Sequence, residues 1–266
     1  MTSADPAVIK ACCAAGYQSD LVALILGDSY HPGGPALTRH LADALGVTAG
    51  QRVLDVASGP GSTALLLAEE YGATVEGVDL GTEAVEAANR LAREAGFGGE
   101  AGTRVTFRVG DAERLPVADG SVDVVISECA LCTFPDKATA VGEMARVLRS
   151  GGQVGITDVT MDPDRLDPEL ADLAGWIACL ADARPLDGYR ELMTAAGLSV
   201  KVTEHHDAAL ERMIDMIDAR ITALAMIGTP ALAGVDLEAV RRRVRAAKAA
   251  VVDGVAGYVL LVAVRA

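Results

Sequence analysis

The sequence predicts an α/β fold built on a parallel, doubly wound sheet. Short apolar runs alternate with segments of helical spacing from about residue 50 to Val159. The first run, Val53 to Val56, suits a strand buried on both faces, and it ends at the glycine turn Gly59-Pro60-Gly61. A second run, Thr74 to Val78, ends in the acid Asp79. These observations together predict a strand–turn–helix–strand unit that binds an adenosine-containing cofactor, with Asp79 accepting hydrogen bonds from the ribose hydroxyls.

The other elements follow in chain order. The later strands are expected at Val105–Val109, Ser121–Ser127, a fifth segment ending near Val159, Ser199–Thr203 and Tyr258–Val264. Helices are expected at Leu170–Asp182 and Leu186–Ala196, and a loop rich in proline and aspartate at Asp158–Pro168. We expect two parts: residues 1–48, an N-terminal helical cap segment, and residues 49–266, one domain with a helical insert at about 207–253. The insert is interpreted as a lid or a homodimer surface.

Composition limits the function. Hydrophobic residues make up 51% of the 266 residues, which is enough for a full core. The net charge of −14 disfavours nucleic acid as a partner, because phosphates need a positive surface. The sequence shows no membrane span and no basic-then-apolar leader at Met1–Lys10, so a cytoplasmic location is the expectation.

The glycine turn does not fit a dinucleotide fingerprint, which requires G-x-G-x-x-G. Its glycines are Gly59 and Gly61, preceded by Ala57 and followed three residues later by Ala64. The segment resembles motif I of class I S-adenosylmethionine (SAM) methyltransferases, an acid followed by G-x-G-x-G. Asp55 fills the acid position, and Ala57 departs from the first glycine.

Further landmarks support the resemblance. Asp111 follows the third strand, and Arg146 to Gly152 is similar to the family's RVL-x-x-GG helix end before strand five. The resemblance implies a Rossmann-like, seven-stranded fold of methyltransferase type and SAM as the cofactor. Asp111 would hold the adenine amino group, Ala112 would pack the ring, and the turn would hold the methionine end. The implied cofactor-binding residues are Asp55, Ala57, Ser58, Gly59, Gly61, Asp79, Leu80, Asp111, Ala112 and Glu128.

Five cysteines form the second informative feature: Cys12, Cys13, Cys129, Cys132 and Cys179. In a cytoplasmic chain they are expected to be reduced. Cys129 and Cys132 follow the fourth strand and Cys179 follows the fifth, at the sheet edge where substrates bind.

Two stretches around these cysteines narrow the resemblance. Ser127-Glu128-Cys129, followed by Pro135-Asp136-Lys137, resembles the arsenite methyltransferase pattern. That resemblance implies that Cys129 and Cys179 are catalytic thiolate ligands of a metalloid, and that Cys12 or Cys13, with Cys13 preferred, is a third ligand. Glu128 departs from a common Asn, and no cysteine lies between Ala14 and Arg52. The region after the fourth strand also resembles quinone-type C-methyltransferases.

The resemblance does not determine which molecule accepts the methyl group. Soft thiolates suit trivalent arsenic, whose lone pair needs no general base. Alternatively, the chain is a C- or O-methyltransferase of an apolar small molecule of quinone or natural-product type. A hydroxyl acceptor needs a base, and the histidines are His31, His40, His205 and His206. A non-catalytic SAM-binding or metalloid-binding protein is a third hypothesis.

The cysteines also have plainer interpretations. Free cysteines often serve as small apolar core residues. The C-x-x-C pair Cys129–Cys132 could instead join Cys12 and Cys13 in a four-thiolate zinc site.

Overall fold

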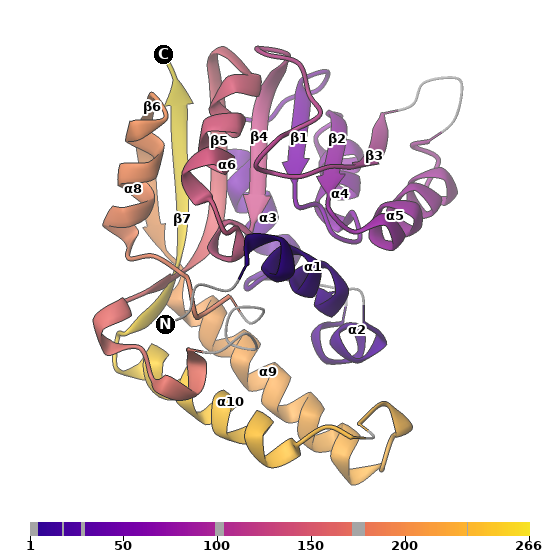
Figure 1. Cartoon of the computed structure of the whole chain (residues 1–266). Coiled ribbons are helices and arrows are strands. Elements are labelled where there is room, and N and C mark those ends of the chain that lie inside the picture. The colour runs from indigo at the N-terminus through magenta and orange to yellow at the C-terminus, as the bar shows by residue number, and fades with distance from the viewer. Residues whose placement is uncertain (1–4, 18, 28–29, 99–103, 172–178, 233) are drawn as a thin grey trace.

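The computed structural model describes residues 5–17, 19–27, 30–98, 104–171, 179–232 and 234–266. Its centre is a seven-stranded sheet with the strand order β3-β2-β1-β4-β5-β7-β6 (Figure 1). In chain order the strands are β1 Arg52–Val56, β2 Thr74–Asp79, β3 Val105–Val109, β4 Val122–Glu128, β5 Leu148–Met161, β6 Leu198–His205 and β7 Ala256–Arg265. The predicted α/β, seven-stranded fold is confirmed.

The sheet is mixed rather than wholly parallel. Strands β1 to β5 pair in parallel, whereas β7 lies between β5 and β6 and is antiparallel to both. The chain runs outward from β1 to β3 and then returns to β4 on the other side of β1. The carboxyl ends of β1 and β4 therefore meet at the point where the strand order reverses, which is where ligands bind in such sheets.

One predicted loop is in part a strand. Strand β5 continues through Asp158 to Met161, although this stretch was expected to begin the loop at Asp158–Pro168. The extension exists because β7 pairs with it from Asp158↔Val259 to Met161↔Ala256. Long-range hydrogen bonding thus outweighs the local turn preference. The helix expected at Leu170–Asp182 falls largely on residues 172–178, outside the described residues.

Helices cover both faces of the sheet. They are α1 Pro6–Tyr17, α2 Asp20–Leu26, α3 Gly34–Ala44, α4 Ser62–Glu70, α5 Thr82–Glu94, α6 Lys137–Val147, α8 Leu186–Ala195, α9 Asp207–Met226 and α10 Leu237–Val252. Short 3₁₀ turns lie at Leu131–Thr133, Pro163–Arg165, Pro168–Leu170 and Pro230–Leu232. Alternate residues of β1 show the two layers: Val53 packs in the core beneath α3 and α4, whereas Leu54 packs in the core beneath α6.

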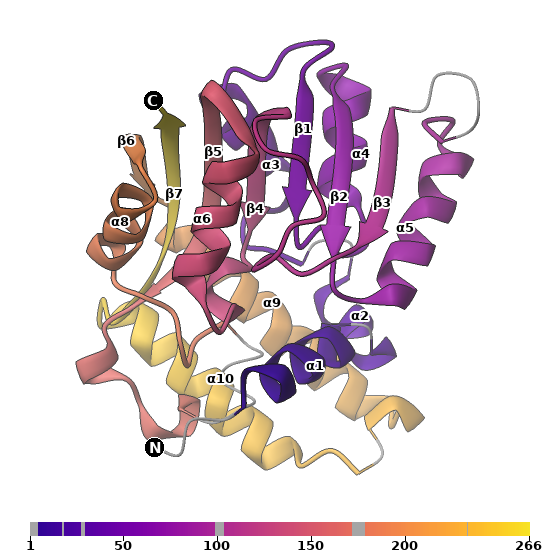
Figure 2. The same cartoon turned by 45° about the horizontal axis from the view of Figure 1, so that its top comes forward.

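The segments at the two ends of the chain frame one edge of the sheet. Figures 1 and 2 place α1 across the carboxyl ends of β4 and β1, with the α9–α10 pair beyond it. Among the described residues, no single helix has the length and apolar character to cross a membrane; only the bent pair α1 and α2, taken together, meets that test.

Candidate functional site

A pocket of about 460 Å³ opens at the carboxyl ends of β1, β2 and β4 beneath α1. It holds most of the residues predicted from the sequence. The predicted residues that line it are Cys13, Asp55, Ala57, Ser58, Gly59, Asp79, Leu80, Glu128 and Cys129. Four other predicted residues, Gly61, Asp111, Ala112 and Cys179, do not line it. The pocket is large enough for a cofactor or a small substrate.

The turn after β1 is formed by residues in the left-handed backbone region. Ala57 has φ +60°, Gly59 +50° and Gly61 +86°. A Cβ atom added at Gly59 would meet no atom within 4 Å, so this glycine leaves open space beside the pocket. A Cβ atom at Gly61 would lie 2.5 Å from Cζ of Phe107. Gly61 is therefore required for packing between the turn and β3, which explains why it does not reach the pocket.

Helix α4 begins without a side-chain cap. Gly61 is its N-cap and makes no side-chain capping bond. Thr63 Oγ1 instead donates a hydrogen bond to Glu128 Oε2, 2.6 Å away. The side chain thus crosses from α4 to the end of β4 and fixes the carboxylate.

Two of the carboxylates that line the pocket, Asp79 and Asp55, differ in their hydrogen bonding. Asp79 accepts N–H bonds from Gly59 and Gly81, each at 2.8 Å. Burial raises the pKa of Asp79, and these N–H groups oppose the rise. Asp55 Oδ2 and Ser58 Oγ are buried, and neither has a hydrogen-bond partner among the described residues. Burial, with Glu128 and Asp79 nearby, raises the pKa of Asp55 well above its ordinary value.

Asp111 lies beside the pocket in an ion-pair cluster. Lys10 of α1 places its Nζ 2.8 Å from Asp111 Oδ2 and 2.5 Å from Glu113 Oε2. These contacts fasten α1 to the segment after β3. Sequence reasoning missed Lys10, because a lone lysine in an expected helix gives no sign of such a distant partner.

Glu128 is the centre of a buried polar cluster at the end of β4. Thr38 Oγ1 donates to its two carboxylate oxygens at 3.2 and 3.1 Å, and His31 Nδ1 lies 3.6 Å from Oε1. Thr38 was missed because it lies far from Glu128 in the sequence, on the face of α3 that packs against the sheet. His31, a candidate base, lines the pocket.

Two of the predicted cysteines come together. The Sγ atoms of Cys129 and Cys179 are 3.7 Å apart, and the Tyr17 hydroxyl lies 3.2 Å from Cys179 Sγ. Both cysteines have positive φ, +52° and +63°. Apart from Ala57, they are the other non-glycine residues in the described part of the chain with this conformation. Such strained backbone is held by its surroundings and gathers at functional sites.

The thiols differ in their tendency to ionise. Hydrogen bonds from Cys129, Cys132 and Tyr17 lower the pKa of Cys179, although burial opposes this change. Burial, with nearby Cys179, raises the pKa of Cys13 to about 11. Cys179 is therefore the thiol of the group that ionises most readily.

The structure does not bring Cys12 and Cys13 together with Cys129 and Cys132 as a zinc site. In the described ranges, the group of three side chains able to hold a metal ion lies elsewhere, at His40, Glu204 and His206. Cys132 is buried, and its backbone N–H donates to Asp158 Oδ2 at 3.1 Å. Burial raises the pKa of Asp158 to about 7, and Cys179 adds to the rise.

Comparison with known proteins shows which proteins this chain resembles. Residues 54–156 match the family model described as a methyltransferase domain. The methyltransferase GfsG of Streptomyces halstedii is 36% identical over 170 residues, which are 63% of this chain and 59% of GfsG. An arsenite methyltransferase of Halobacterium salinarum is 35% identical over 168 residues, 62% of this chain and 42% of that protein. The chain thus spans about half the length of these curated relatives.

A solved structure has the same fold. The phosphoethanolamine N-methyltransferase 2 of Haemonchus contortus, in complex with SAM, superposes with a TM-score of 0.76 at 22% sequence identity. The match covers 97% of this chain and 60% of the other.

Proposed function

We propose that this chain, whose residues 54–156 match a methyltransferase domain, is a class I, SAM-dependent enzyme that transfers the SAM methyl group to trivalent arsenic bound by cysteine thiolates. The observation that carries the proposal is the 3.7 Å separation of the Cys129 and Cys179 sulfurs beside the pocket. Two thiolates bound to one soft ion at roughly 2.3 Å lie under about 4 Å apart. The pair therefore has the spacing that a single metalloid atom requires.

The donor set of the pocket fits SAM. Each Asp79 oxygen accepts one N–H bond and keeps a second lone pair, to which a ribose hydroxyl would donate. The buried, unpartnered oxygen of Asp55 and the carboxylate of Glu128 would face the positive charges of the methionine end, next to the open backbone at Gly59. Ala57 and Ser58 would shape this end of the site, and Gly61 would support the turn through its packing against Phe107.

The adenine end is proposed near the ion-pair cluster. Asp111 and Ala112 would hold and pack the ring, with Leu80 at the end of β2. Asp111 is already bonded to Lys10, so α1 would close over the adenine while the carboxylate keeps its partner.

SAM supplies an electrophilic methyl group when bound. The chain's own contribution is the placement of the acceptor. Cys129 and Cys179 would bind arsenic as thiolates, and Tyr17 would stabilise the Cys179 thiolate by donating its hydroxyl hydrogen. Arsenic held in this way keeps its lone pair as the nucleophile, so no side chain has to remove a proton. Such positioning alone is worth roughly 7–11 kcal/mol. Cys13 faces the same pocket from α1 and is our candidate for the third ligand.

Single cysteine substitutions test the proposal. Transfer of labelled methyl from SAM to arsenite is measured for the wild type, Cys129→Ser, Cys179→Ser and the control Cys12→Ser, which does not line the pocket. We expect the first two variants to lose at least about 100-fold in rate, comparable to the loss of one positioned group. They should keep their SAM affinity, and the control should match the wild type. Unchanged methylation in Cys129→Ser and Cys179→Ser would refute the arsenic acceptor.

A second candidate function is methylation of a hydroxyl group on an apolar small molecule. His31 lies 3.6 Å from the Glu128 carboxylate in the pocket wall, an arrangement that suits a general base. His31→Ala separates the two functions: it should abolish transfer to hydroxyl acceptors and leave transfer to arsenite unaffected. A protein that binds SAM but methylates neither acceptor class would be a binding protein instead.

A further inference from the structure

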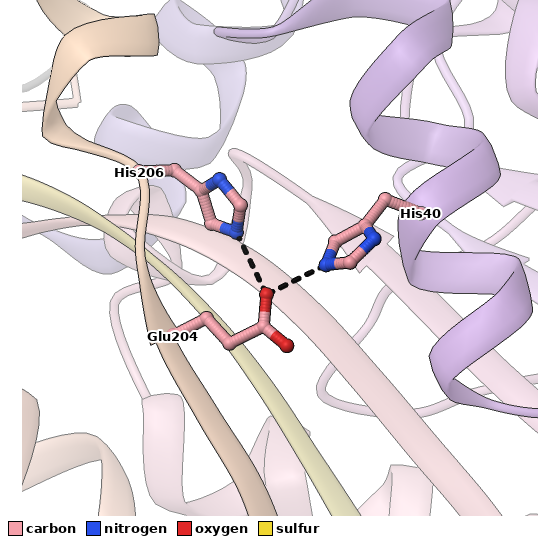
Figure 3. Close-up of side chains that lie close together, drawn as sticks. All are labelled: His40, Glu204 and His206. Carbon is pink, nitrogen blue, oxygen red and sulfur yellow. Dashed lines mark hydrogen bonds and ion pairs between the residues drawn. The ribbon is translucent and has the colours of Figure 1, made fainter.

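A second cluster of metal-ligating side chains lies where α3 meets the junction of β6 and α9. His40 Nε2 is 2.6 Å from Glu204 Oε2, and His206 Nε2 is 3.2 Å from the same oxygen. Figure 3 shows both rings turned toward the same oxygen of this carboxylate, with the His206 ring to its left and the His40 ring to its right. The three ligand atoms all lie within 4.8 Å of one another, and none of the three residues lines the pocket.

The scaffold fixes the three residues independently of one another. Glu204 lies in β6 opposite Leu260 of β7, and the His206 N–H donates to the Tyr258 carbonyl at 2.7 Å. His40 is held by α3, whose neighbouring Leu41 is fully buried against the sheet. The ligand atoms are thus brought together by packed elements rather than by a flexible loop, as a metal site requires.

We propose that His40, Glu204 and His206 form a binding site for a divalent transition ion of the zinc type, which fastens α3 to the start of α9. Two imidazole nitrogens and one carboxylate oxygen are donors that Zn²⁺ accepts at about 2.0–2.2 Å, with water in the fourth position. The imidazoles favour such an ion over the harder ions Ca²⁺ and Mg²⁺, which prefer oxygen ligands.

The hydrogen-bonded form converts readily into the metal-bound form. In the structure, the Nε2 atoms of His40 and His206 are both hydrogen-bonded to Glu204 Oε2. When the ion replaces the two bridging hydrogens, each neutral imidazole carries its proton on Nδ1, and a small rotation of the Glu204 side chain makes room for the ion. The ion would join residues 164 positions apart in the chain.

Zinc binding to the full chain tests this site. Equilibrium dialysis near neutral pH, with ZnCl₂ as the probe, is carried out on the wild type, His40→Ala, Glu204→Gln and the control His205→Ala. His205 is the neighbouring histidine that is not part of the group. We expect the wild type to bind one equivalent of zinc at this site. The affinity for that equivalent should fall at least 10-fold in His40→Ala and Glu204→Gln and should be unchanged in the control. Equal zinc affinity in wild type and His40→Ala would overturn the proposal.

The cysteines are alternative zinc ligands, and a second measurement distinguishes zinc bound by them from zinc bound by the histidines. Saturating zinc should raise the melting temperature of the wild type, Cys129→Ser and His205→Ala by at least about 4 °C, but not that of His40→Ala. A zinc-dependent rise that survives in His40→Ala and disappears in Cys129→Ser would assign the ion to the cysteines and overturn the proposal.

Discussion

Replacement of Ala57 by glycine should stabilise the protein. Ala57 has φ +60°, a conformation that costs an L-residue about 1–2 kcal/mol but costs glycine almost nothing. Glycine also gives the unfolded chain more freedom, which opposes the gain by about 0.4–1 kcal/mol. The difference leaves Ala57→Gly with a free energy of unfolding about 0.5–1 kcal/mol higher than that of the wild type. In a domain of this size, such a gain raises the melting temperature by about 2 °C.

Urea unfolding, followed by circular dichroism, measures this difference. The matched control is Ala87→Gly: Ala87 also lines the pocket and is half-buried, but it lies within α5. Glycine in a helix interior costs about 1 kcal/mol, so the control should lower the free energy of unfolding. Equal destabilisation by the two substitutions would refute the claim that the Ala57 backbone is strained.

Three further predictions concern the turn, the cofactor and the acid beneath the cysteines. Gly61→Ala should lower the free energy of unfolding by about 2–5 kcal/mol, because it places an alanine in the left-handed region and brings its Cβ atom to 2.5 Å from Phe107. Urea unfolding measures this loss, and a loss below about 1 kcal/mol would contradict the prediction. Asp79→Ala should weaken SAM binding at least about 10-fold by calorimetry, since charge-assisted hydrogen bonds to the ribose are lost; an unchanged affinity would remove Asp79 from the site. Asp158 keeps its proton up to a pKa of about 7 when folded and to about 3.8 when unfolded, so the native state binds more protons between these values and the free energy of unfolding falls as pH rises through them. This fall should be of order 2–4 kcal/mol in urea titrations between pH 4 and 8, and Asp158→Asn should flatten it; an identical profile in the variant would assign the slope to other groups.

The parts of the fold that depend on local pattern could be predicted from the sequence. The run at Val53–Val56, the glycine turn and Asp79 form one continuous unit, and the structure has each where it was expected. The end of β5 could not be predicted, since Asp158 and Thr160 read locally as loop residues. They are held in a strand by β7, which lies about a hundred residues further along the chain.

Part of the arrangement of the candidate site could be predicted in the same way. Cys129 directly follows β4, and Cys179 lies in the segment after its parallel neighbour β5; such segments meet at one sheet edge, so their proximity could be expected. Contacts made by helices across the sheet edge could not. Thr38 and Lys10 occupy ordinary helical positions, and their partners are known only once α3 and α1 are packed.

Helix α1 contacts both ends of the pocket. Its Lys10 holds the segment after β3, near the proposed adenine end, while its Tyr17 touches Cys179 at the sulfur end. A ligand that orders α1 from one end therefore lowers the entropic cost of binding at the other. Thermodynamic reciprocity then requires the methyl donor and the methyl acceptor to raise each other's binding affinity by the same factor. Helix α1 would thus make the binding of the two ligands cooperative.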